Sequence, residues 1–145
     1  MLLRQAQKED LNILTALAVQ LWPHHAAAEL GEDLAKTMEK EDAAFFLAFE
    51  GERAVGFAQC QLRRDYVEGT ESSPVGYLEG IYVAEDCRGR GIARMLLSAC
   101  ESWAKTLGCR EFASDCELEN EQSLQFHLNV GFREAGRIIC FSKKL

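Results

Sequence analysis

Residues 88–93, Arg-Gly-Arg-Gly-Ile-Ala, have the composition of an anion-binding loop. The two glycines permit a tight turn and a close approach of backbone to ligand. The apolar spacing that follows predicts a helix from Ile92 to Leu107, whose first amides have no acceptor within the helix. Those amides and the positive end of the helix dipole suit a pyrophosphate, and Arg88 and Arg90 add charge nearby. The alternative is that the glycines merely shape a turn before the helix.

Glu79 is the second residue whose type and position suggest chemistry, because it is a carboxylate inside the apolar segment Tyr77–Val83. Burying an unpaired carboxylate is costly, so Glu79 is expected to have a charged partner or a functional role.

The elements that must position these residues alternate in the manner of a mixed α/β domain. A polar, glycine-containing loop is expected from Asp65 to Pro74, just before the strand that carries Glu79. Strands are predicted at Leu2–Gln5, Ala43–Phe49, Arg53–Arg63, Val75–Val83, Glu111–Asp115 and Arg137–Lys143, and helices at Glu9–Leu21, Glu29–Met38, Ile92–Leu107 and Glu121–Asn129.

Composition limits the classes of function. The length of 145 residues suggests one domain over 1–145. A net charge of −7 argues against binding nucleic acid and is compatible with a cationic ligand. No apolar stretch approaches the roughly 20 residues of a membrane helix. The N-terminus lacks the basic region and long apolar segment of a secretion signal, so a cytoplasmic protein is expected. The six cysteines lack CxxC spacing, which favours reduced thiols and no metal site.

Three motifs in order resemble the GNAT superfamily of N-acetyltransferases. Residues 88–93 match its pyrophosphate-binding pattern Q/R-x-x-G-x-G/A, Leu78–Val83 resembles its fourth strand, and Asn120 with His127–Phe132 resembles its second motif. The resemblance implies a GNAT fold with a mixed central sheet of about six to seven strands, about four helices, and a V-shaped splay between the fourth and fifth strands. It also implies acetyl-CoA as co-substrate, bound by Ile81, Tyr82, Val83, Arg88, Gly89, Arg90, Gly91, Ile92, Ala93 and Asn120.

Further segments resemble one GNAT subgroup, the bacterial aminoglycoside 6'-N-acetyltransferases. They are Leu21–His25, Arg64–Val67, Ser72–Val75, Leu78–Ile81 and Cys109–Asp115. The resemblance implies a homodimer that confers aminoglycoside resistance, with an antibiotic pocket lined by Trp22, His25, Tyr66, Glu79 and Asp115. Apart from Glu79, each pocket residue has an ordinary structural alternative, such as a helix stop, a loop anchor or a strand-end cap. The chain departs from the subgroup at Gly136, where relatives carry an acidic residue that contacts the antibiotic across the dimer interface.

The mechanism implied by the family is direct attack of a neutral amine on the thioester, so a nucleophilic cysteine is unnecessary. Glu79 or Asp115, directly or through water, is the candidate base. His127 stands where many relatives carry a tyrosine that protonates the leaving thiolate, although a histidine that packs the helix is an equal alternative. Two other functions stay open: a GNAT enzyme for another polyamine or a peptide amine, and a non-catalytic acyl-CoA binding module.

Overall fold

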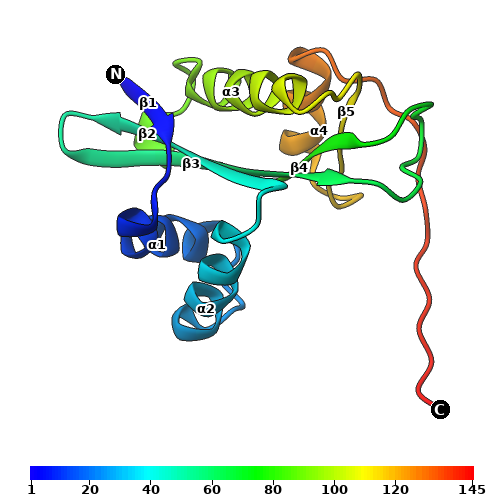
Figure 1. The fold of residues 1–145 in the computed structure, drawn as a ribbon, viewed down its shortest axis with the longest axis horizontal. Coiled ribbons are helices and arrows are strands. Elements are labelled where there is room, and N and C mark those ends of the chain that lie inside the picture. The colour runs from blue at the N-terminus through cyan, green and yellow to red at the C-terminus, as the bar shows by residue number, and fades with distance from the viewer.

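The computed structural model describes all of residues 1–145, and its central sheet has five strands that lie side by side in chain order (Figure 1). The strands β1 to β4 pair antiparallel, and β5 runs parallel to β4. The elements are β1 (Leu2–Gln5), a 3-10 turn (Lys8–Asp10), α1 (Leu11–Leu21), α2 (Ala27–Met38), β2 (Ala43–Glu50), β3 (Arg53–Arg63), β4 (Val75–Val83), a second 3-10 turn (Glu85–Cys87), α3 (Ile92–Thr106), β5 (Phe112–Ser114) and α4 (Glu121–Asn129).

Helices cover both faces of the sheet, with α1 and α2 on one side and α3 on the other (Figure 1). The uninterrupted apolar run of β2 follows from this arrangement, because a strand buried on both faces has no polar side. Its Phe45 and Leu47 pack toward α1 and α2, whereas Phe46 and Ala48 join the cluster around α3. No helix of the fold is both long and apolar enough to cross a membrane.

The helix α3 packs a single apolar stripe onto the sheet. Ile92, Leu96, Leu97, Cys100 and Ala104 are its buried residues, at the spacing of one helical face. Burying each of the larger side chains, Ile92, Leu96 and Leu97, stabilises the fold by roughly 1.5–3 kcal/mol. The stripe therefore fixes the start of the helix against the sheet. The position of the glycine loop before Ile92 is thereby set by the core.

The strands β4 and β5 separate after a short stretch of pairing. Their parallel register covers three residue pairs and ends at Leu78 with Ser114. The strand β4 continues to Val83, so from Glu79 onward its edge on that side has no strand partner. This unpaired edge lies where a splay between the fourth and fifth strands is expected.

The prediction of a sixth strand at Arg137–Lys143 was wrong, and the sheet has five strands rather than six to seven. A strand needs a neighbour to accept and donate backbone hydrogen bonds, and this segment leaves the domain as an extended tail (Figure 1). Its apolar side chains have no cover: Ile138 is 79%, Ile139 81% and Phe141 91% exposed.

Candidate active site

The strand β4 is irregular at Glu79. In the pairing with β3, Gln59 lies opposite Gly80 and Cys60 lies opposite Leu78, so Glu79 has no partner on β3. Such a bulge breaks the alternation of a strand and redirects a side chain. Leu78 stays in the core beside α3, while Glu79 turns to the opposite face. This change of face is the ordinary alternation of a strand. The bulge acts on the next residue, because Gly80 also faces α1 and so shares the cavity side with Glu79.

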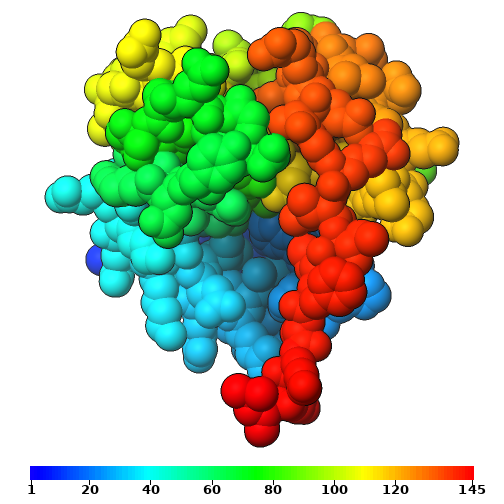
Figure 2. All heavy atoms as spheres, turned by 90° about the vertical axis from the view of Figure 1, so that its right-hand side faces the viewer, coloured from blue at the N-terminus to red at the C-terminus, as the bar shows by residue number.

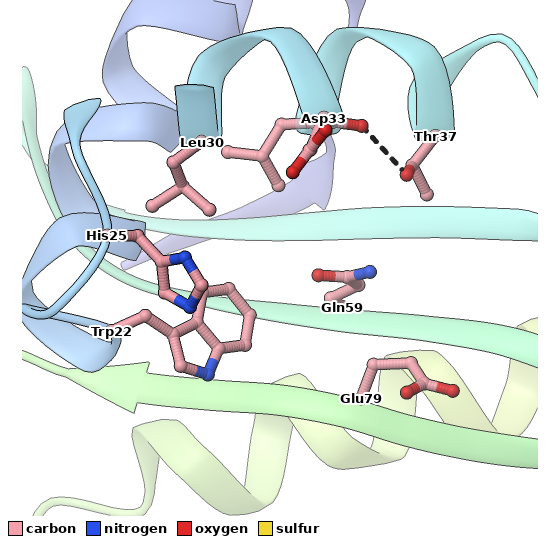
Figure 3. A pocket seen from close by; sticks show the side chains of 8 residues that line it. Trp22, His25, Leu30, Asp33, Thr37, Gln59 and Glu79 are labelled. Atoms are coloured by element: carbon pink, nitrogen blue, oxygen red, sulfur yellow. Dashed lines mark hydrogen bonds between the residues drawn. The ribbon is translucent and has the colours of Figure 1, made fainter. Parts of the chain in front are cut away.

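On that face lies a cavity of about 240 Å³ between the two N-terminal helices and the sheet. Figure 2 shows the molecule hollowed between the blue α1–α2 segment and the green β3–β4 segment. In Figure 3, Asp33 of α2 and Glu79 of β4 lie on opposite sides of the hollow, with the rings of Trp22 and His25 at one end. Three of the residues predicted to bind an acceptor, Trp22, His25 and Glu79, are thus brought together.

The indole of Trp22 lies close against β4 because Gly80 has no side chain. A Cβ atom on Gly80 would be 2.6 Å from Cζ2 and 2.8 Å from Cη2 of Trp22. The same ring packs edge-on against Phe57, with ring centres 6.0 Å apart. Trp22 is therefore a fixed wall of the cavity, and the residue also ends α1, in agreement with the expected stop before Pro23.

Glu79 is held by an arginine of the neighbouring strand. Arg63 donates from Nε and Nη2 to Oε1 of Glu79 at 3.1 and 2.9 Å, and from Nη2 to Oε2 at 2.9 Å. Its guanidinium carbon lies 3.4 Å from the centre of the Tyr77 ring. This is the charged partner expected for Glu79, whose side chain is half-buried, and it leaves Asp33 as the cavity carboxylate without an ion pair.

Tyr77 connects this pair to the second predicted carboxylate, Asp115. Its hydroxyl donates a short hydrogen bond to Oδ2 of Asp115. Burial, and then this hydrogen bond, raise the pKa of Tyr77, so the phenol stays protonated and acts as a donor. Asp115 is exposed just beyond β5 and does not line the cavity. It therefore stands beside the cavity and is linked to Glu79 through Tyr77 and Arg63.

Tyr66 is placed away from the cavity wall. It lies in the loop between β3 and β4 and is 76% exposed. Because the loop is polar and carries no core residue around Tyr66, the ring is available to a ligand but is not preset against one.

The glycine loop has the geometry expected of an anion cradle. Gly89 and Gly91 have φ values of 78° and 80°, in the left-handed region that favours glycine, and Gly91 caps α3. A Cβ atom on either would meet open space within 4 Å. The first helical hydrogen bond runs from the amide of Met95 to the carbonyl of Gly91, which leaves the amides of Ile92, Ala93 and Arg94 free to bind an anion.

The two arginines of the loop are engaged elsewhere. Arg90 forms an ion pair with Glu50 and also donates to the carbonyl of Cys87 at 3.4 Å. Arg88 donates from Nε to the carbonyl of Val83 at 2.8 Å and lies 5.7 Å from the Tyr82 ring centre. They would therefore favour anion binding through their nearby positive charge rather than through a contact that is already in place.

His127 and Asn120 both have partners within the fold. Nδ1 of His127 lies 2.7 Å from the carbonyl oxygen of Ser123, and Nε2 lies 2.7 Å from Oγ of Ser114. A carbonyl oxygen only accepts, so Nδ1 donates to Ser123, while either Nε2 or Oγ of Ser114 can be the donor in the second contact. Asn120 caps α4 by accepting from the amide of Ser123 at 3.1 Å. Both residues tie α4 down, and any role toward a cofactor would be additional.

The thiols offer no nucleophile to the site. Cys60, Cys87, Cys100 and Cys109 are buried and free, whereas Cys116 and Cys140 are exposed and free. A hydrogen bond to Cys60, together with burial, raises the pKa of Cys100, which keeps it a neutral thiol. No group of three or more His, Cys, Asp or Glu side chains is arranged to hold a metal ion.

Reasoning from the sequence missed Arg63, Tyr77 and Asp33. The signal for Asp33 was present, because Leu30, Leu34 and Thr37 stand at the spacing of one helical face and Asp33 falls within it. The contacts of Arg63 and Tyr77 depend on the register between β3 and β4, and local pattern does not show this register.

Comparison with known proteins places these features in a family. Residues 3–132 match the acetyltransferase (GNAT) family. The aminoglycoside N(6')-acetyltransferase type 1 of Stenotrophomonas maltophilia is 42% identical over 99% of this chain and 93% of its own length. The structure of AAC(6')-Iy in complex with the bisubstrate analogue CoA-S-monomethyl-acetylneamine is 39% identical, with a TM-score of 0.94 over 99% of this chain and 97% of that one. The aminoglycoside 6'-N-acetyltransferase AAC(6')-IG of Acinetobacter haemolyticus, solved without ligand, is 36% identical, with a TM-score of 0.95 over 100% and 99%.

Proposed function

Since the chain belongs to the acetyltransferase (GNAT) family, we propose that it transfers the acetyl group of acetyl-CoA to the 6'-amino group of aminoglycosides and thereby confers resistance. The observation that carries the proposal is the cavity beside the unpaired edge of β4, which presents Trp22, His25, Asp33 and Glu79. It offers an aromatic wall and carboxylates, which are the groups that a polyamine sugar requires. The names of the relatives support the 6' position.

Acetyl-CoA fits the region between the glycine loop and the splayed strand. The free amides of Ile92 and Ala93 would bind the pyrophosphate, with Gly89 and Gly91 allowing it to approach the backbone. The pantetheine arm would then lie along the edge of β4 that lacks a partner after Leu78. This path brings the thioester toward Glu79, because that residue begins the unpaired edge and its side chain lines the cavity.

The reaction needs the acceptor amine in its neutral form. We place Glu79 as the group that receives its proton, directly or through water, and Asp115 as the group that orients a second ammonium. The amine nitrogen then forms a bond to the thioester carbon while an amide of the β4 edge polarises the carbonyl oxygen. The bond from carbon to sulfur breaks, and the leaving thiolate takes a proton from His127 or from water.

The acceptor is expected to carry several positive charges. Asp33 has no ion-pair partner, and the net charge of −7 concentrates cations near the molecule. Polyamines share this chemistry with aminoglycosides, which makes a polyamine the second candidate acceptor. Trp22 and His25 favour the sugar, because rings offer stacking surface to a cyclic ligand.

We further propose a homodimer that forms through the tail after Phe132. Ile138, Ile139 and Phe141 are at least 79% exposed, and β5 is the outer strand of the sheet with an unpaired edge. Exposed apolar residues and an open sheet edge each favour pairing with a second copy. Gly136 offers no carboxylate to a partner's site, and nearby Glu134 is paired with Arg137. Light scattering that shows a monomer at micromolar concentration would contradict the dimer.

We also propose that the enzyme acts in the cytoplasm, where buried thiols such as those of Cys60 and Cys100 stay reduced.

The test of the proposed function is an acceptor screen. Acetyl-CoA turnover is followed by thiol release with kanamycin, tobramycin, spermidine and a peptide, and the acetylated nitrogen is then located by NMR. The proposal expects fast turnover with the two aminoglycosides and acetylation at the 6' nitrogen. Faster turnover with spermidine or the peptide would favour another GNAT acceptor. Tight binding of acetyl-CoA with no thiol release from any amine would indicate a binding module.

A further inference from the structure

Arg63 occupies the place where an acceptor ammonium would pair with Glu79. Its three hydrogen bonds, at 2.9 to 3.1 Å, engage both carboxylate oxygens. A carboxylate has about four acceptor positions, so roughly one remains for a ligand. An amine that approaches Glu79 from the cavity therefore meets a carboxylate that is already shared with a cation.

The ion pair between Arg63 and Glu79 can stay in place while Glu79 also binds a ligand amine. The Arg63 side chain is 40% exposed and that of Glu79 is 19% exposed, so the bond lies at the boundary of the cavity and water. The guanidinium also stacks on Tyr77 at 3.4 Å from the ring centre, which holds it even when one of its hydrogen bonds is given up. Arg63 can thus admit an amine to Glu79 without leaving the site.

This arrangement matters because a protonated amine cannot attack a thioester. A lone carboxylate would bind an ammonium tightly and favour its charged, unreactive form. A positive charge beside the same carboxylate acts in the opposite direction and favours the neutral amine. Tight binding of the ground state alone also adds nothing to the rate of the chemical step.

We propose that Arg63 is a positioning residue for the transfer reaction: by sharing the carboxylate of Glu79, it keeps the bound acceptor amine from being held as an ammonium. The proposal rests on the proposed function and adds a role for a residue outside the predicted site. The other charged or titratable groups facing Glu79 are Tyr77 of its own strand, His25 after α1 and Asp33 of α2. None of these is a permanent cation, so the assigned effect falls to Arg63.

The test compares Arg63→Gln, which keeps hydrogen bonding but removes the charge, with Arg63→Lys, which keeps the charge. The matched control is Arg64→Gln, because Arg64 is the next residue and its ion pair with Asp42 at 3.2 Å lies outside the cavity. For each full-length enzyme, kcat and KM for kanamycin and KM for acetyl-CoA are measured between pH 6 and pH 9.5. The affinity for kanamycin is measured separately by calorimetry, and folding by thermal melting.

In Arg63→Gln we expect the affinity for kanamycin to rise about fivefold and kcat at pH 7 to fall about tenfold. The acidic limb of the pH profile of kcat should move up by about one pH unit, so kcat should recover as pH rises. In Arg63→Lys both the affinity for kanamycin and kcat should stay close to those of the wild type, and Arg64→Gln should match the wild type. Weaker binding of kanamycin, or an unmoved acidic limb, in a folded Arg63→Gln enzyme would overturn the role of Arg63 while leaving the proposed function intact. Absence of kanamycin turnover by the wild type would instead overturn the proposed function, and the role of Arg63 with it.

Discussion

Replacing Glu79 with glutamine removes the proposed base while keeping its shape. The amide oxygen still accepts from Arg63, which now makes two of its hydrogen bonds at Oε1. A partly exposed ion pair contributes at most about 1 kcal/mol to stability, so the variant should fold. Loss of general base catalysis lowers turnover by roughly a hundredfold, which corresponds to about 2.7 kcal/mol in the barrier. The catalytic loss should therefore be much larger than the loss of stability.

The assay measures kcat and KM for kanamycin from pH 6 to pH 9.5 in Glu79→Gln and in Asp115→Asn. The side-chain amide oxygen introduced by Asp115→Asn can still accept from Tyr77, so this variant changes charge with little change in packing. We expect Glu79→Gln to lose turnover and to regain part of it at high pH, where more of the amine is already neutral. Asp115→Asn should chiefly raise KM, without rescue by pH. Wild-type turnover of folded Glu79→Gln at every pH would refute the assignment and leave Asp115 or water as the base.

Four further changes test the loop, the cavity and the fold. Gly91→Val should raise KM for acetyl-CoA about tenfold or more, since its φ is 80° and its Cβ would project into the open space of the cradle. Asp33→Asn should raise KM for kanamycin about tenfold with little change in kcat, because it removes an unpaired charge of the cavity. Gly80→Ala should raise KM for kanamycin but not for acetyl-CoA, because the methyl group would meet the indole ring at 2.6 Å. Hydrogen bonding to Arg4 lowers the pKa of Asp10 to about 2. The ionised carboxylate therefore adds at most about 2 kcal/mol to the free energy of unfolding above pH 4, and this is lost as pH falls through about 2. Urea unfolding between pH 5 and pH 2 should accordingly show a flatter dependence in Asp10→Asn than in the wild type.

Most of the sheet was predictable from the sequence, because its strands pair with neighbours close along the chain. The predicted strands Ala43–Phe49, Arg53–Arg63 and Val75–Val83 agree with β2, β3 and β4 to within one residue. The glycine loop and the start of α3 at Ile92 were also confirmed, since a capping glycine and an apolar stripe are local signals. The prediction failed at Arg137–Lys143, whose strand-like composition finds no neighbour within the chain.

The candidate site was predictable in its residue types and less so in its contacts. Of the five residues expected in one pocket, Trp22, His25 and Glu79 line a cavity, whereas Tyr66 and Asp115 do not. Local pattern does not predict the bulge at Glu79, however, which puts Gly80 on the same face and lets the Trp22 ring lie against the strand.

The charge of the cavity shows why pairing matters more than composition. Two carboxylates line the cavity and Asp115 stands beside it, which suggests a strongly acidic site, but the three differ in their partners. Arg63 shares Glu79, Tyr77 donates to Asp115, and Asp33 alone of the three has neither an ion pair nor a side-chain donor. A cation would therefore bind first where the charge is unshared and react where it is shared. This division suits a reaction that must attract a protonated polyamine and then use one of its nitrogens in the neutral form.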